Sequence, residues 1–457
     1  MERKLLSRRE FLSAAGLALG GAALAACAPA TPAPEEKPEV TEAPPEPEAV
    51  EITFWQHYGG ESRPDQTNKL IGEYKEVAPN VTVVYETIPI VDYDKKLTST
   101  LAAGSGSDMF AIGDWNFALY TSKDWLAPAD PASFGVADIK ELMDLYLPGS
   151  LNGVVLDDQL YGIPNEYNVL HTYWWKDDME EAGLDPDVAP ATWEECGEVG
   201  AKLTVRDASG NMTRAGMQWT YRPPMSTEWP VKCFHPLIYQ LGGDILSEDG
   251  TECTMNSPEG EHACEFYLDL VEKYKCSEPG FTIAEINQEF WEHRSSIWFQ
   301  GPWGVGGWRS VDPDTVARWP EGWGIANFPK WSEEYHKRDM SPMWRWCYVV
   351  NRNSPNAQVA WKFIDFLSQD QIGWLTAVGD IPCRKGWEDD PATEDLPWLE
   401  TQLKDFPNGV PVPQTPKYQE LADLVSQALE RIMSDRGNIK QHLDKAKEDI
   451  DAMLKEA

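Results

Sequence analysis

ITFWQHYGGESRPDQTNKLIGEYKEVAPNVTVVYETI, residues 52–88, decides the fold class. It opens with an apolar strand pattern at Ile52–Trp55 and continues with apolar residues at helical spacing from Leu70 to Val77. Pro79 stops this helix, and a second strand pattern follows at Val81–Ile88. A strand, a helix and a strand in this order predict a βαβ unit, and therefore an α/β fold with a mainly parallel sheet flanked by helices.

The same alternation continues along most of the chain. The further elements that we expect are a helix near Tyr93–Ala103, strands at Met109–Ile112, Leu170–Trp175, Ser295–Phe299 and Tyr348–Asn351, helices opened by Thr192-Trp193-Glu194-Glu195, Ser257-Pro258 and Ser354-Pro355, and two amphipathic helices at about 417–434 and 439–455.

The first 26 residues resemble an export signal. Ser7-Arg8-Arg9-Glu10-Phe11-Leu12 is a twin-arginine motif, and the Ala/Gly-rich run after it is shorter than the ~20 apolar residues that span a membrane. Leu24-Ala25-Ala26-Cys27 is similar to a lipobox, which predicts a signal peptide at 1–26 and lipidation of Cys27. The alternative is an ordinary signal peptide with a chance cysteine. Residues 27–49 are rich in Pro and Glu and predict an extended stalk that holds the rest of the chain outside the cell, near the membrane.

Size and charge limit the remaining possibilities. The chain after the signal exceeds the ~250–300 residues at which one core stops growing, so two domains are expected. A net charge of -36 disfavours binding to nucleic acid or to an anionic lipid surface and is typical of a soluble, exported protein. We expect a monomer that touches the membrane only through its lipid anchor.

The cysteines and histidines contain no pattern of a metal or redox site. Beyond Cys27 the seven cysteines lack a C-x-x-C spacing, and some of them are expected to form disulfides outside the cell, with Cys196 left free. The sequence has no P-loop, no H-E-x-x-H and no G-x-S-x-G motif. We therefore expect no catalytic residues, no metal and no cofactor.

The order of short motifs resembles that of the family 1 extracellular solute-binding proteins of bacterial ABC importers, which include maltose-binding protein. The motifs that carry the resemblance are Gly104-Ser105-Gly106-Ser107-Asp108, Tyr161-Gly162-Ile163-Pro164, Tyr173-Trp174-Trp175-Lys176-Asp177, Glu181-Ala182-Gly183-Leu184, Thr192-Trp193-Glu194-Glu195, Gly242-Gly243-Asp244, Asn256-Ser257-Pro258-Glu259-Gly260, Gly301-Pro302-Trp303, Ala360-Trp361-Lys362-Phe363 and Ile381-Pro382-Cys383-Arg384. Trp175 stands where the family usually has Asn, and Trp344-Arg345-Trp346 stands where it often has small residues. These departures bear on the ligand and not on the fold.

The resemblance implies two α/β lobes, a ligand held between them and a hinge that the chain crosses three times. We place the crossings near 161–167, 323–329 and 378–384. Lobe one would then hold 50–163 and 330–378, and lobe two 170–322 and 388–457. The implied function is capture of a sugar and its delivery to the permease subunits of an ABC importer, without catalysis.

The 21 tryptophans suit such a ligand, because sugars offer apolar C–H faces to aromatic rings. Ligands of open α/β sheets bind beyond the carboxyl ends of strands, and polar and aromatic residues follow two expected strands there. The predicted ligand-binding residues are Trp55, His57 and Tyr58 after the first strand, Asp114, Trp115 and Asn116 after another, Asn165, Glu166 and Tyr167 at the first crossing, Trp303 in Gly-Pro-Trp, Trp344 and Arg345, and Arg384 at the third crossing. The alternative for each of these residues is a structural role. The side chain would then pack in the core, pair with a carboxylate or lie at a solvated position of the hinge.

The favoured ligand is an oligosaccharide or glycoside. A polyol or a glycerol phosphoester is the alternative within the same class, although no segment expected at the cleft is basic enough for a phosphate. A secreted carbohydrate-active hydrolase is the alternative from another class, since it too would combine tryptophans with carboxylates. A sensory ectodomain is disfavoured because no membrane-spanning stretch follows.

Overall fold

The computed structural model describes residues 48–58, 63–151, 153–220 and 228–456. The predicted signal peptide, Cys27 and nearly all of the predicted stalk lie outside these residues, so their predictions stay predictions. In the described part of the chain, no helix has both the length and the apolar character that crossing a membrane requires.

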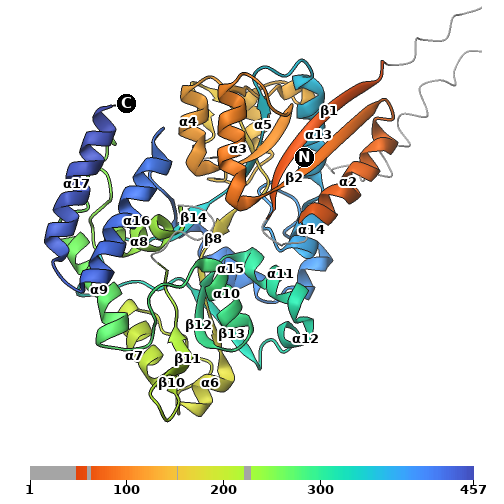
Figure 1. Ribbon diagram of the computed structural model, residues 1–457. Coiled ribbons are helices and arrows are strands. Elements are labelled where there is room, and N and C mark those ends of the chain that lie inside the picture. The colour runs from red at the N-terminus through yellow and green to blue at the C-terminus, as the bar shows by residue number, and fades with distance from the viewer. Residues whose placement is uncertain (1–47, 59–62, 152, 221–227, 457) are drawn as a thin grey trace, which may run out of the picture. The chain divides into compact units, whose positions relative to one another are not determined.

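The first sheet is built around the expected βαβ unit. Its strands follow the order β2-β1-β3-β15-β4, and β7 also pairs with β15 (Figure 1). Their bounds are β1 (Val50–Tyr58), β2 (Val81–Pro89), β3 (Met109–Gly113), β4 (Leu126–Ala127), β7 (Ile163–Pro164) and β15 (Trp346–Asn351). The helices near this sheet are α2 (Arg63–Val77), α3 (Ile90–Ala102), α4 (Phe117–Ser122), α5 (Ile139–Asp144) and α13 (Ala357–Gln369).

The second sheet has the order β10-β11-β12-β9-β13. Its strands are β9 (His171–Trp175), β10 (Val205–Arg206), β11 (Met212–Met217), β12 (Ser295–Gln300) and β13 (Trp323–Asn327). The helices around it are α6 (Lys176–Glu181), α7 (Trp193–Leu203), α10 (Ile283–Trp291), α11 (Pro302–Val311), α12 (Pro313–Val316) and α15 (Leu399–Lys404).

The expectation of mainly parallel sheets is wrong, because both sheets are mixed. In the first sheet β1 runs parallel to β2 and β3, whereas β15 runs antiparallel to β3, β4 and β7. In the second sheet β11 and β12 are parallel, whereas β9 runs antiparallel to both β12 and β13. A helical crossover makes consecutive strands parallel, and β12 and β13, which α11 and α12 connect, do run in the same direction, both antiparallel to β9. The mixed character therefore comes mainly from the reversed strands β9 and β15. Strand and helix alternation alone cannot reveal that difference.

A small third sheet, β16-β14-β8, lies between the two larger ones in Figure 1. It joins β8 (Asn168–Val169), β14 (Ser341–Trp344) and β16 (Gly409–Pro411), and a separate hairpin joins β5 (Val155–Leu156) to β6 (Gln159–Leu160). The remaining elements are α8 (Glu228–Gln240), α9 (Pro258–Glu272), α14 (Gln371–Gly373), α16 (Tyr418–Asp435), α17 (Ile439–Lys455) and the short turns η1 (Asp114–Asn116), η2 (Pro131–Phe134), η3 (Trp374–Val378), η4 (Pro391–Asp395) and η5 (Phe406–Asn408).

Two helices begin at the capping residues that the sequence predicted. Thr192 and Glu195 form both hydrogen bonds of a capping box at α7, and the Ser257 side chain accepts from the Gly260 amide at α9. The prediction at Ser354-Pro355 is wrong by two residues, because α13 begins at Ala357 after the cap position Asn356.

The seven described cysteines are all buried and free, so the expected disulfides are wrong. The expectation that Cys196 is free is confirmed. Burial raises the pKa of Cys253 to about 11 and that of Cys276 to about 12, so neither thiol ionises near neutral pH. These residues act as small apolar side chains of the core.

Candidate functional site

Two Gly-x-Trp segments lie at the ends of β3 and β12. In each segment the tryptophan ring lies so close to the glycine two residues earlier that a Cβ atom there would overlap the ring, at Gly113 for Trp115 and at Gly301 for Trp303. Glycine is therefore required at both positions to let the ring fold back over the backbone. The two strands thus end in tryptophans with fixed positions.

Five tryptophans form a set that we call the aromatic cluster, namely Trp115, Trp229, Trp303, Trp344 and Trp346. Trp344 contacts Trp303 edge to face at 4.9 Å between ring centroids and Trp229 at 5.6 Å. Trp115 contacts Trp346 in the same manner at 5.1 Å. These geometries are the ones that aromatic pairs prefer.

Lys232 joins the two halves of the aromatic cluster. Its ammonium lies 4.0 Å from the ring centroid of Trp344 and 4.3 Å from that of Trp115. Lys232 and Trp229 come from α8, whereas Trp115 comes from η1 after β3 and Trp346 is the first residue of β15. Lys232 is thus more than 100 residues from both Trp115 and Trp346 in the sequence, and Figure 1 shows α8 next to β14.

A buried ion pair lies beside the cluster. Arg345 Nε donates to Asp114 Oδ2 at 3.2 Å, and Arg345 Nη1 donates to the Ser150 carbonyl at 2.7 Å. Both side chains of the ion pair are 2% exposed. Burial raises the pKa of Asp114, although the positive charges of Arg345 and Lys232 work in the opposite direction.

Three polar atoms of the predicted site residues are buried without a hydrogen-bond partner among the described residues: His57 Nδ1, Asp114 Oδ1 and Asn116 Nδ2. The His57 ring stacks on Trp346 at 3.5 Å, and burial followed by the charge of Arg63 holds the pKa of His57 well below its usual value. Asn116 Oδ1 accepts from Gln419 of α16 at 3.2 Å. Buried polar groups are normally paired, so these three atoms offer one acceptor, one donor and one imidazole nitrogen to a ligand.

A second ionic group connects the start of α2 with two of the predicted crossings. Arg63 donates to Glu166 at 2.8 Å and to Asp380 at 2.5 Å, and all three side chains are buried. Asn165, with its amide oriented to satisfy both neighbours, donates to the Trp346 carbonyl at 2.7 Å and accepts from Arg63 at 3.2 Å. Glu166 and Asn165 thus bind the protein itself and hold the backbone of the aromatic cluster.

The structure brings together His57, Asp114, Trp115, Asn116, Trp303, Trp344 and Arg345 of the predicted ligand-binding residues, with Asn165 and Glu166 behind them. It places the other predicted residues elsewhere. Trp55 lies under the Lys96 ammonium at 4.4 Å, and Tyr167 packs on Phe406. Arg384 pairs with Asp365 at 2.6 Å. The side chain of Tyr58 lies outside what the structure describes.

Sequence reasoning missed Trp229, Lys232, Trp346, Arg63 and Gln419. Trp346 stood in the quoted Trp344-Arg345-Trp346 segment, and the spacing of Trp229 and Lys232 places both on one face of a helix. Those two signals were present in the sequence. For Arg63 and Gln419 there was no local signal, because their partners are brought close only by the fold.

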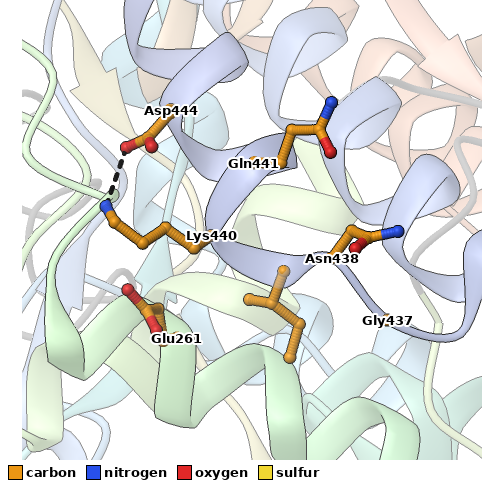
Figure 2. Close-up of a pocket in the computed structure, with 7 residues that line it drawn as sticks. Glu261, Gly437, Asn438, Lys440, Gln441 and Asp444 are labelled. Atoms are coloured by element: carbon orange, nitrogen blue, oxygen red, sulfur yellow. Dashed lines mark hydrogen bonds and ion pairs between the residues drawn. The ribbon is translucent and has the colours of Figure 1, made fainter.

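A further pocket lies at the start of α17, away from the aromatic cluster. It has a volume of about 590 Å³ and is lined by Glu261, Asp444 and residues 437–441. Figure 2 shows its polar side chains and the Lys440–Asp444 ion pair of 3.1 Å. None of its lining residues is aromatic, so it offers no platform for a sugar ring. In the described residues, no group of His, Cys, Asp or Glu side chains is arranged to hold a metal.

The comparisons with known proteins agree on one family. The model of the bacterial extracellular solute-binding protein family matches residues 60–373. A binding protein of Brucella abortus is 24% identical over 390 residues, which are 82% of this chain and 87% of the relative. The mannitol-binding protein of Pseudomonas aeruginosa is 23% identical over 321 residues, 68% of each chain.

Among solved structures, an ABC transporter solute-binding protein from Thermotoga lettingae, bound with alpha-D-tagatose, superposes with a TM-score of 0.76. It is 22% identical, and the match covers 89% of this chain and 100% of that one. At this identity the likeness establishes the fold, which is the two-lobed α/β fold of these proteins.

Proposed function

The chain belongs to the bacterial extracellular solute-binding protein family, and from this premise we propose that it captures a carbohydrate at the aromatic cluster and delivers it to the permease of an ABC importer. The lobe boundaries and crossings given above are part of the proposal. Closure of the lobes around the ligand would follow from contacts that form only in the closed state.

The proposal rests on one observation. Five tryptophans lie close to three buried polar atoms that have no hydrogen-bond partner among the described residues. A sugar presents C–H faces that pack on aromatic rings and hydroxyls that donate and accept hydrogen bonds at its edge. His57, Asp114 and Asn116 supply the complementary polar atoms. The structural relative that binds tagatose and the sequence relative named for mannitol support a polyhydroxylated ligand.

The extent of the aromatic cluster favours an oligosaccharide or a glycoside over a single sugar. Trp303, Trp229 and Trp344 form one half of the cluster, and Trp115 and Trp346 form the other. Two groups of rings suit two or more sugar units. A polyol is the second candidate, because the Pseudomonas aeruginosa relative is named for mannitol.

We propose binding without hydrolysis. The family and its matched relatives are binding proteins. A glycosidase needs two carboxyl groups on either side of the scissile bond, about 5–9.5 Å apart. Glu166 and Asp380 both hold Arg63, and Asp114 holds Arg345, so each of these carboxylates already has a structural partner.

A thermal-shift screen over a panel of neutral oligosaccharides, polyols and phosphoesters tests the proposal. A ligand at about 100 times its Kd adds about 2.7 kcal/mol to the free energy of unfolding, which raises the melting temperature by several degrees. Mass spectrometry of the recovered sugar separates a binding protein from a hydrolase. Cleaved sugar would contradict the proposal, and so would a panel in which only phosphoesters bind.

Trp303→Ala is expected to weaken sugar binding about 10- to 100-fold, while the unliganded melting temperature changes little. Trp303 is half-buried, at the second position of α11, and packs on Trp344. The expected loss corresponds to about 1–3 kcal/mol for a ring that covers a sugar face. Calorimetric titration gives the affinity. A large drop of the unliganded melting temperature with an unchanged affinity would place Trp303 in the core instead.

We also propose that the protein is held at the outer face of the cell membrane by a lipid on Cys27. The family is extracellular, and the lipobox-like Leu24-Ala25-Ala26-Cys27 supports the anchor. Cys27→Ser is expected to move the protein from the detergent phase to the aqueous phase in a phase-partition assay. Unchanged partition would exclude lipidation at Cys27.

A further inference from the structure

Glu166 and Asp380 form a buried pair of carboxyl groups where the first and third predicted crossings meet. Their side chains are 3% and 0% exposed, and both accept hydrogen bonds from Arg63 of α2, at 2.8 and 2.5 Å. One residue further along each segment, the Tyr167 amide donates to the Ile381 carbonyl at 2.9 Å. The acid pair therefore lies where these two crossings are hydrogen-bonded to each other and to α2.

The two carboxyl groups also interact with each other. Burial raises the pKa of Asp380 well above its usual value, and the negative charge of Glu166 and a hydrogen bond to its side chain raise it further, although Arg63 acts in the opposite direction. A hydrogen bond between two carboxyl groups needs a proton on one of them, and two buried carboxyl groups that share a site do not both ionise. Glu166 is the acceptor, because Asn168 Nδ2 also donates to its Oε1 at 2.7 Å.

The other titratable or charged groups of the described residues that face the acid pair do not change charge between neutral and mildly alkaline pH. They are Arg63 of α2, His57 of β1, Cys347 and Tyr348 of β15, and Cys383 of the third crossing. Burial raises the pKa of both thiols and of the Tyr348 phenol and lowers that of His57, so these four groups stay uncharged, and a guanidinium stays charged. A change of charge in this range therefore falls on the acid pair itself.

Asn165 connects the acid pair with the aromatic cluster. Its side-chain amide, in the orientation that satisfies both neighbours, accepts from Arg63 at 3.2 Å and donates to the Trp346 carbonyl at 2.7 Å. Its backbone amide donates to the same carbonyl at 3.0 Å. Trp346 in turn stacks on His57 and packs on Trp115. The same hydrogen bonds thus fix the first crossing and one ring of the aromatic cluster.

We infer that Glu166 and Asp380 share one proton at neutral pH and that this proton is a switch for ligand affinity. The protonated pair holds the two crossings in the arrangement that binds ligand, and loss of the proton places a second negative charge in the same buried space, which drives the crossings apart. Ligand then binds only the shrinking fraction of molecules that keep the proton, so its apparent affinity falls by up to about tenfold per pH unit. The link to affinity rests on the proposed function, whereas the shared proton does not.

Infrared spectroscopy of the ligand-free protein tests the shared proton. A protonated carboxyl group has a C=O stretch that is separate from the bands of carboxylates and amides. We expect this band at pH 7 in the spectrum of the unaltered protein minus that of Asp380→Asn, and again in the difference from Glu166→Gln. A missing band in the differences would overturn the inference. If neither variant folds, neutron diffraction from crystals of the unaltered protein decides whether a proton lies between the two carboxyl groups.

Asp365→Asn is the matched control for the infrared measurement. Asp365 also binds an arginine of the third crossing, Arg384, at 2.6 Å, but its side chain is 15% exposed and it does not belong to the acid pair. Its replacement should leave the band of the protonated carboxyl group in place. Loss of the band in this variant would show that the proton lies elsewhere and would overturn the assignment to Asp380.

Calorimetric titrations between pH 6 and pH 9 test the link to affinity. The probe is whichever of maltotriose, cellotriose and xylotriose raises the melting temperature most. We expect the unaltered protein and Asp365→Asn to bind it more weakly as the infrared band disappears, by up to about tenfold per pH unit. Asp380→Asn has no proton to lose at this place, so its affinity should show no comparable fall.

The outcomes separate the switch from the shared proton and from the proposed function. An affinity that stays unchanged while the band disappears would overturn the switch and leave the shared proton standing. A band that persists to pH 9 would overturn the switch as well, because the acid pair would then not release its proton in this range. If none of the sugars binds, the proposed function fails and the switch fails with it, whereas the infrared result still decides the shared proton.

Discussion

Arg63→Met is expected to lower the free energy of unfolding by about 3–5 kcal/mol, because it leaves two carboxylates buried without their counter-charge. Arg63 is the common partner of Glu166 and Asp380, whose side chains are 3% and 0% exposed. Urea denaturation measures the change. Arg318→Met is the matched control, because its ion pair with Asp177 is about half exposed and worth at most about 1 kcal/mol.

The loss of unfolding free energy caused by Arg63→Met is also expected to depend on pH. Burial raises the pKa of Asp380 well above its usual value, and Arg63 acts against this rise. A carboxyl group whose pKa is raised in the folded state contributes stability that is present at low pH and is lost as pH rises through the folded pKa. Without Arg63 the folded pKa rises further, so the loss of stability should be larger at pH 8 than at pH 5. An equal loss at both pH values would contradict the assigned role of the ionic group.

Trp344→Ala is expected to have the largest effect on ligand affinity, a loss of about 100-fold or more. Trp344 contacts Trp303, Trp229 and the Lys232 ammonium, so its removal disturbs the ring platform and the cation together. Since Trp344 is 3% exposed, the variant should also lose about 3–5 kcal/mol of stability. Calorimetric titration below the melting temperature separates the two effects.

Trp308→Ala provides the control for that variant. Trp308 is fully buried in the aromatic core of the second sheet, against Trp175 and Trp323. Its removal should cost a similar amount of stability but leave the affinity of the folded protein unchanged. Equal losses of affinity in both variants would show that the effect of Trp344→Ala comes from destabilisation alone.

Much of the fold was predictable because local chemistry determines it. Alternating apolar patterns located β1, β2, β3, β9 and β12, and side-chain caps located the starts of α7 and α9. The direction of β15 was not predictable, since it depends on how the chain returns to the first sheet. Helix α8 was missed: Pro236 lies inside it, and an internal proline usually argues against a helix.

The part of the candidate site that lies at the carboxyl ends of strands was predictable. The rule that ligands bind beyond the carboxyl ends of strands led to His57, Asp114, Trp115 and Asn116, which the structure places together. The rule failed to find Lys232, because α8 approaches Trp115 only through tertiary packing. Arg384 lies at a predicted crossing but binds Asp365, because in so acidic a chain a carboxylate partner is near almost any arginine.

Carbohydrate binding at the aromatic cluster is tested most directly by a crystal structure of the protein with the neutral sugar that binds most tightly in the panel. We predict a sugar ring stacked on Trp115, Trp303 or Trp344, with a hydroxyl within hydrogen-bond distance of Asp114 Oδ1. A sugar bound elsewhere, for example in the pocket at the start of α17, with the aromatic cluster left unoccupied, would contradict it.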